Sequence, residues 1–321
     1  MSSGIRPSTY AGELYPEDPE KLSTLLITLL DEDFVCMKEK RTHRAAFVPQ
    51  SSLHCAGRIS GKAYSTLFKG LDSRIKRIVI IAPMKQKPSG RIKTTPFSSA
   101  ETPLGTVLFD TEKINLLTKN ETLFEKMDGK REEKEFAVEI QLPLLRYIFN
   151  RTEYSVPILP LYVSSWPSEE QTKMLKSLSS TSFFLIVSDV CHYGSVFRYA
   201  PAEPELKGTI MLLRGKDDIK KHEHRGVKKQ KIASMVEEIN MLCLHYICLN
   251  SLDFFIEYMS KAGNNIPGLF GILLFLRLEI QGRWTLLAYG SSRELLSEKD
   301  VSVSYAAMAF TQTPRGAASS E

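Results

Sequence analysis

The 321-residue chain is 43% hydrophobic and 25% charged, a composition typical of a globular protein with enough apolar material for a large core. Its formal charge of +5 is well below that of nucleic-acid-binding domains, so we expect no nucleic-acid partner. No window approaches the roughly 18 apolar residues of a membrane span, and the amino terminus has no apolar signal-peptide core, so we expect neither.

The cysteines indicate the redox compartment. They are odd in number, scattered and without C-x-x-C spacing, at Cys36, Cys55, Cys191, Cys243 and Cys248. This pattern is typical of reduced thiols and argues against a disulfide framework or a zinc knuckle. We therefore expect a cytoplasmic protein, with the nucleus as the other compartment that this pattern allows.

In the first part of the chain, helices alternate with buried strands. Residues 16–33 predict a helix capped by Asp18, and residues 57–71 predict a second one. Apolar strands are predicted over 44–49 and 77–83. A strand, a helix and a strand at this spacing form a βαβ unit, whose strands end at the same edge of the sheet.

In the second part, prolines modify two predicted elements. Residues 133–149 predict a helix that Pro143 breaks or kinks, and residues 155–163 predict a strand whose prolines place parts of it at an edge. Other segments are predicted as strands (106–109, 183–187, 285–289, 302–311) and helices (231–249, 252–261, 268–278). We expect one α/β domain over residues 5–312, with a mixed, mostly parallel central sheet flanked by helices, and a disordered tail at 313–321.

The candidate site follows the apolar run 183–187. There the sequence reads Ser188-Asp189-Val190-Cys191-His192-Tyr193-Gly194. At the carboxyl end of a buried strand, Asp189 and His192 can face one pocket, where the carboxylate would orient the imidazole for proton transfer. The structural alternative is a histidine hydrogen-bonded inside a tight turn that the aspartate stabilises. Cys191 is either a thiol activated by His192 or a small buried apolar residue.

Several motifs together resemble one known family. They occur in the family's order, from about residue 5 to residue 310, and resemble the Memo family (mediator of ErbB-driven cell motility), whose fold is similar to that of LigB-type class III extradiol dioxygenases. The motifs are Ile5-Arg6-Pro7 with Tyr10-Ala11-Gly12-Glu13-Leu14-Tyr15-Pro16, then Glu101-Thr102-Pro103-Leu104-Gly105, Glu139 with Leu142-Pro143, Ser188 to Gly194 with Phe197-Arg198-Tyr199, and Ser302-Val303-Ser304-Tyr305-Ala306-Ala307.

The resemblance implies a metal centre whose ligands this chain has replaced. Gln50 stands where the family's Pro-His-Ala-Gly-Tyr motif has its histidine, and Lys85 and Gln86 stand for the two histidines of Pro-Ser-His-His. Counting back from Gly271 places Asn265 at the family's pocket cysteine. Amide oxygens are poor ligands for iron, copper or zinc, and Lys85 would repel a cation, so we expect neither a metal nor a cofactor.

A helix motif has changed in the same way. The family's Glu-His-Ser-Ile-Glu-Met-His-Leu-Pro reads Glu135-Phe136-Ala137-Val138-Glu139-Ile140-Gln141-Leu142-Pro143 here, without either histidine. The catalytic pair Asp189 and His192 would then be vestigial. The ligand pocket is expected to be lined by Gln50, Lys85, Gln86, Cys191 and Asn265.

The resemblance implies a non-enzymatic protein that binds a protein or a phosphorylated peptide, since family members are linked to signalling towards cell motility and the cytoskeleton. The cations Lys85, Lys87 and Arg91 beside the crevice favour an acidic ligand. The alternative is a redox or dioxygenase-like enzyme with a site rebuilt around His192, with His54 as a relocated ligand. The basic stretch 214–231 is typical of a solvated loop, and the sequence does not indicate an oligomeric state.

Overall fold

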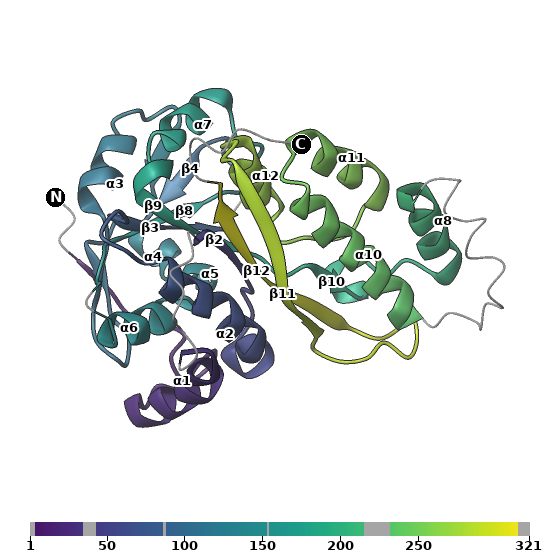
Figure 1. Ribbon diagram of the computed structural model, residues 1–321, viewed down its shortest axis with the longest axis horizontal. Coiled ribbons are helices and arrows are strands. Elements are labelled where there is room, and N and C mark those ends of the chain that lie inside the picture. The colour runs from purple at the N-terminus through teal and green to yellow at the C-terminus, as the bar shows by residue number, and fades with distance from the viewer. Residues whose placement is uncertain (1–3, 35–42, 86–87, 153, 215–231, 314–321) are drawn as a thin grey trace.

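The computed structural model describes residues 4–313 except 35–42, 86–87, 153 and 215–231 (Figure 1). Its longer helices are α1 (Pro19–Phe34), α2 (Leu53–Gly70), α6 (Leu142–Asn150), α7 (Glu169–Lys176), α8 (Glu203–Arg214), α10 (Ile232–Cys248), α11 (Leu252–Ala262) and α12 (Leu269–Arg277). The shorter ones are α3 (Thr111–Leu117), α4 (Gly129–Glu132) and α5 (Phe136–Glu139), with single turns η1 (Ser179–Thr181) and η2 (Ser195–Phe197).

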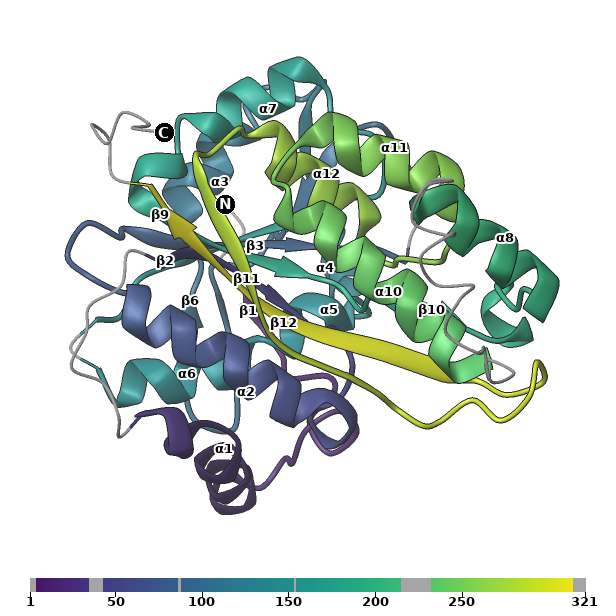
Figure 2. The same ribbon diagram turned by 45° about the vertical axis from the view of Figure 1, so that its right-hand side comes forward.

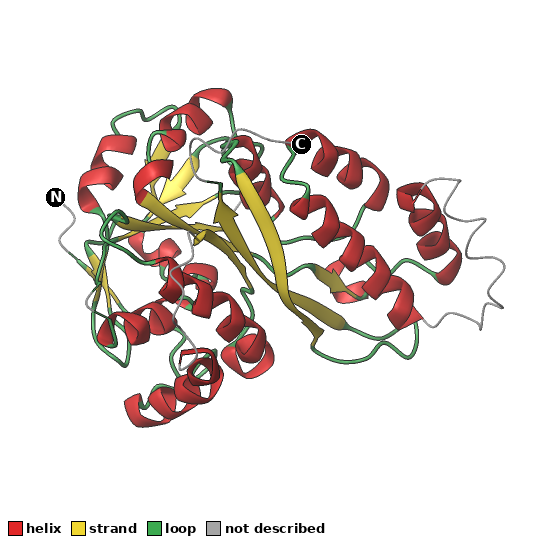
Figure 3. Cartoon of the chain, viewed as in Figure 1, coloured by secondary structure: helices red, strands yellow, loops and turns green. Residues whose placement is uncertain are grey.

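The strands of the described residues form two sheets. The small sheet joins β1 (Ile5–Arg6), β5 (Ser99–Ala100) and β6 (Val107–Leu108). The large sheet has the order β10 (Cys191–Tyr193), β12 (Ser302–Gln312), β2 (His43–Val48), β9 (Ser182–Val187), β3 (Arg77–Ala82), β8 (Ile158–Tyr162), β4 (Ile92–Thr94) and β7 (Phe124–Lys126), with β11 (Gly282–Ser291) paired to β12. The helices and this twisted sheet are distinguished by colour in Figure 3.

The centre of the large sheet is parallel. Strands β2, β9, β3 and β8 run side by side in one direction, and every residue in them is buried. Strands buried on both faces have continuous apolar runs, which explains why all four of these strands were predicted from the sequence, even β8 with its prolines. Helices α1, α2 and α6 lie on one side of the sheet, and α7, α11 and α12 lie on the other (Figures 1 and 2). The predicted α/β fold with a mixed sheet flanked by helices is confirmed.

The carboxyl ends of the central strands meet at one edge. Val48 pairs with Val187, and Ala82 pairs with Tyr162, so β2, β9, β3 and β8 end at similar heights. The loops that follow them lie at this edge, the carboxyl edge of the sheet, which is the usual ligand position in open α/β sheets. The antiparallel strands β10, β11 and β12 extend the sheet beyond β2, which confirms the two predicted closing strands.

Proline has the predicted effect at one of the two positions. Helix α5 ends at Glu139 and α6 begins at Leu142 with Pro143 in its first turn, so the predicted break is confirmed. The prediction that parts of 155–163 lie at an edge is wrong, because β8 is buried between β3 and β4. Strand β4 pairs with β8 only at Tyr162, and the carbonyl of Pro160 accepts a hydrogen bond from the Thr94 hydroxyl (2.7 Å).

No helix among the described residues combines the length and apolarity needed to cross a bilayer. The predicted tail lies outside the described residues from position 314 onwards.

Candidate functional site

Asp189 lies just after the end of β9 with no exposed surface. Its Oδ1 accepts a hydrogen bond from the backbone N–H of Gln50 (3.2 Å), and its Oδ2 accepts one from the Ser51 hydroxyl (2.8 Å). The same Oδ2 lies 2.9 Å from Nε2 of His192. The Asp189–His192 contact expected from the sequence is therefore present. The carboxylate also joins the end of β9 to the loop after β2, which favours the structural interpretation of Asp189.

Cys191 and His192 are neighbours in strand β10, which places their side chains on opposite faces. The prediction of a simple turn missed this strand, which pairs antiparallel with β12. Successive side chains of a strand point to opposite faces, so the His192 side chain is 18% exposed while Cys191 is buried among Leu206 and Met235. Burial raises the pKa of Cys191 to about 12, although the Asn265 backbone N–H opposes this rise. The activated-thiol interpretation of Cys191 is wrong.

Asn265 holds the segment after β10. Its backbone carbonyl accepts a hydrogen bond from the N–H of His192 (3.1 Å), and its side-chain Nδ2 donates one to the carbonyl of Phe197 (2.9 Å). The Phe197 ring lies 4.7 Å from the His192 ring, centroid to centroid. Asn265 is thus brought to the predicted site, where its amide nitrogen bonds to the protein itself.

Lys85 lies in the loop after β3 and is exposed. Its ammonium nitrogen is 4.3 Å from the centroid of the Phe136 ring, a cation–π contact. Its backbone N–H donates to both carboxylate oxygens of Glu135 (3.1 and 3.2 Å). Lys85 and Phe136 both stand at positions where the resembled family has histidine, so two replaced residues now contact each other.

Gln141 and Gln50 differ in how their amides are used. Gln141 is buried in the core, where its Nε2 donates to the carbonyl of Pro49 (3.0 Å) and its Oε1 accepts from the Tyr64 hydroxyl (2.7 Å). Gln50 is 6% exposed, and its side-chain amide has no hydrogen-bond partner within the described residues. Gln50 is therefore the amide most available to a ligand.

The other residues named from the sequence have different outcomes. Gln86 and Lys87, like the basic stretch 215–231, lie outside the described residues. Arg91, one of the cations expected to favour an acidic ligand, forms an ion pair with Glu125 (2.5 Å). His54 is exposed on the first turn of α2.

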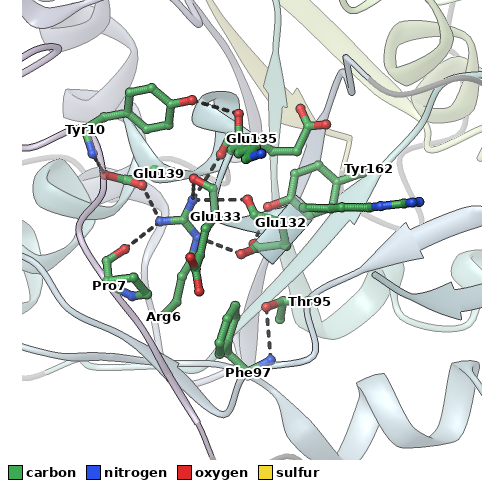
Figure 4. Close-up of polar contacts among 12 residues, drawn as sticks. Arg6, Pro7, Tyr10, Thr95, Phe97, Glu132, Glu133, Glu135, Glu139 and Tyr162 are labelled. Carbon is green, nitrogen blue, oxygen red and sulfur yellow. Dashed lines mark hydrogen bonds and ion pairs between the residues drawn. The ribbon is translucent and has the colours of Figure 1, made fainter. Parts of the chain in front are cut away.

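A buried charged cluster includes Tyr162 at the end of β8 and was not recognised in the sequence (Figure 4). The Arg6 guanidinium donates to Glu132 (2.7 Å) and to Glu139, and the hydroxyls of Tyr162 and Tyr15 donate to Glu132 (2.5 Å) and Glu139 (2.8 Å). Burial would lower the pKa of Arg6, but the nearby Glu132, Tyr162 and Glu139 raise it overall. Burial also raises the pKa of Glu132, an effect that Arg6 opposes. Arg6 and Glu139 belong to quoted motifs, yet nothing in the sequence pairs them.

The donor set does not fit the transition-metal centre that the resemblance implies. Asn265 uses its amide nitrogen on Phe197, and both oxygens of Asp189 already accept hydrogen bonds. In the part of the chain that the structure describes, no three His, Cys, Asp or Glu side chains converge as metal ligands. A carboxamide such as that of Gln50 is a hard, neutral ligand that suits other groups better.

Comparisons with known proteins agree on one family. The family model described as Memo-like protein matches residues 6–309. A MEMO1 family protein of Schizosaccharomyces pombe is 28% identical over 95% of this chain and 99% of its own length, and Protein MEMO1 of Homo sapiens is 25% identical over 95% and 97%. The crystal structure of an uncharacterized Escherichia coli K12 protein covers 81% of this chain and 98% of its own, with a TM-score of 0.35 at 11% identity, too low for any inference.

Proposed function

Since the chain belongs to the Memo family, we propose that it is a non-enzymatic member that binds an acidic or phosphorylated segment of a protein partner at the carboxyl edge of its sheet. The process we propose is cytoplasmic signalling towards cell motility and the cytoskeleton, by analogy with the family.

One observation carries the proposal, namely the Lys85 ammonium on the Phe136 ring in the loop after β3. No ion pair of Lys85 with a carboxylate occurs among the described residues, and the Glu135 carboxylate is directed at the Lys85 backbone instead. An exposed cation held beside an aromatic ring offers charge and hydrogen bonds to an anionic group. The same residues offer little to a transition metal.

The proposal predicts that binding depends on phosphate and on Lys85. The probe is a pool of tyrosine- and serine-phosphorylated peptides on beads, with the same pool after phosphatase treatment as its matched control. We expect retention of the purified protein on the phosphorylated pool, and Lys85→Gln should weaken it about tenfold, the usual effect of losing one charge-assisted contact. Lys173→Gln, which removes an exposed lysine of α7, should have no effect. Equal retention on the two pools, or an unchanged Lys85→Gln, would contradict the proposal.

A further inference from the structure

The turn from Gly194 to Tyr199, which contains η2, packs on His192. The N–H of Gly194 donates to the carbonyl of Tyr199 (2.7 Å), so the two ends of the turn are joined at its base. At its tip, the ring of Phe197 lies against the ring of His192 at 4.7 Å. Within the described residues, the tip of this turn therefore forms one wall over the imidazole.

The base and the tip are anchored very differently. Tyr199 packs on the apolar cluster formed by β10, α8 and α10, whereas Val196 is 71% exposed and no residue of η2 is fully buried. Neither Val196 nor Phe197 belongs to an apolar cluster of the described residues. Few buried apolar contacts are the physical signature of a segment that opens locally.

Besides the contact of the Phe197 ring with His192, one side-chain hydrogen bond within the described residues connects the tip to the rest of the molecule. The Nδ2 of Asn265 donates to the carbonyl of Phe197 (2.9 Å), while the backbone carbonyl of Asn265 accepts from His192 on the neighbouring strand (3.1 Å). Asn265 thus bridges the tip and the strand beneath it. A thiol, as at this position in the resembled family, is a weak hydrogen-bond donor and would hold the tip less firmly.

The backbone on both sides of the tip is unusual. Gly194 has φ = 133°, and a Cβ there would come within 2.9 Å of Val301. Arg198 has φ = 58°, a left-handed conformation that a residue with a side chain adopts at a cost. The turn as observed therefore includes a backbone conformation that is costly at Arg198.

We infer that the 194–199 turn is a flap over His192, and that the Asn265 side chain is its latch. When the latch releases, the tip swings away on the Gly194–Tyr199 base and exposes the imidazole. The apparent affinity of any ligand that needs the exposed imidazole is reduced by the closed fraction, so the latch tunes binding. The opening of this flap is independent of the partner that the protein binds.

The first test is native-state hydrogen exchange on the full wild-type chain. The amides of Phe197 and Arg198, which bond inside the turn, should exchange through a local opening that is insensitive to low urea concentrations. The amides of β9 should exchange only through global unfolding. If the flap amides share the protection and urea dependence of β9, the inference is overturned.

The second test removes the latch. In Asn265→Ala, and in Asn265→Asp, which keeps the shape but loses the donor, exchange at the two flap amides should rise about 3- to 10-fold, the effect of one net hydrogen bond. Acylation of His192 by diethylpyrocarbonate should accelerate equally, measured against the exposed His54 of the same sample. Asn264→Ala is the matched control, because the amide of this neighbouring buried residue has no partner among the described residues. Unchanged exchange in both latch variants, or the same acceleration in Asn264→Ala, would overturn the inference.

Discussion

At the scale of single residues, Asp189 combines complete burial with hydrogen bonds to three chain positions. Its donors are the N–H of Gln50, the hydroxyl of Ser51 and the ring of His192. A buried carboxylate is tolerated when such donors surround it, and the donors in turn lose their partner if it is removed. The structural and catalytic interpretations of Asp189 therefore differ in what a substitution does to stability.

Asp189→Ala should lower the free energy of unfolding by about 1–3 kcal/mol, because it leaves buried donors without an acceptor. His192→Ala should cost less, since its partly exposed ring makes one of those three contacts. Urea denaturation of both variants provides the measurement, and phosphopeptide retention should fall only in proportion to the folded fraction. Unchanged stability in Asp189→Ala would count against the structural role.

Part of the candidate site could be predicted from residue order. The spacing of Asp189 and His192 after an apolar run placed both at the end of a strand, and the structure joins them. The orientation of Cys191 follows from strand alternation, but only once β10 is recognised, and a three-residue strand has too short an apolar pattern for that. The contacts of Lys85 with Phe136 and of Asn265 with Phe197 depend on tertiary proximity, which residue types alone do not reveal.

At the scale of elements, the length of a helix or strand and the spacing of its apolar residues decided whether it could be predicted. The apolar runs of β2, β3 and β9 and the stripes of α1, α2 and α10 lie within a few residues of their predicted ranges. Strand β8 was misplaced at an edge because proline removes one donor, and the structure accommodates this loss where β4 barely pairs with it. The helices α3, α7 and α8 are short or carry weak apolar stripes. Their sequences could therefore not be distinguished from those of loops.

Helices α1 and α2 approach so closely that one glycine is required between them. A Cβ on Gly61 in α2 would lie 2.0 Å from the carbonyl oxygen of Leu29 in α1. Gly61→Ala should therefore destabilise the protein by about 1–3 kcal/mol, as overpacking does, because the two helix backbones must separate.

Gly208 in the interior of α8 provides the matched control, since a Cβ there meets nothing within 4 Å. Gly208→Ala should raise stability by about 0.5–1 kcal/mol through helix propensity alone. Thermal or urea unfolding of the two variants should give shifts of opposite sign. A neutral Gly61→Ala would mean that the two helices can slide apart freely.

At the scale of the whole molecule, the metal content separates the binding function from the enzymatic alternative. Gln50 and Asn265 replace ligands that the resemblance implies, so purified protein should hold far less than one equivalent of iron, copper or zinc. Elemental analysis makes the measurement. Close to one tightly held transition metal per chain would favour the enzyme rebuilt around His192.

The stability of the whole molecule should also fall at alkaline pH because of buried thiols. Burial raises the pKa of Cys191 and of Cys243 from about 9 to about 12, although the Asn265 N–H and the Tyr258 hydroxyl respectively oppose this rise. Above pH 9, the unfolded chain loses these protons while the folded chain keeps them. The unfolded state then binds fewer protons, so the free energy of unfolding decreases as pH rises and levels off near pH 12.

Between about pH 9 and 10.5 the two thiols together should reduce stability by roughly 3 kcal/mol, since one pKa unit corresponds to about 1.4 kcal/mol. Urea denaturation across this pH range measures the slope, which is independent of any constant loss that a substitution causes. Cys243→Ala should make the slope shallower, because it removes one of the two titrating groups. Cys55→Ala, which removes an exposed thiol, should leave the slope as it is in the parent protein. If Cys243→Ala and the parent lost stability equally over this range, the burial of Cys243 would not be the origin of the alkaline instability.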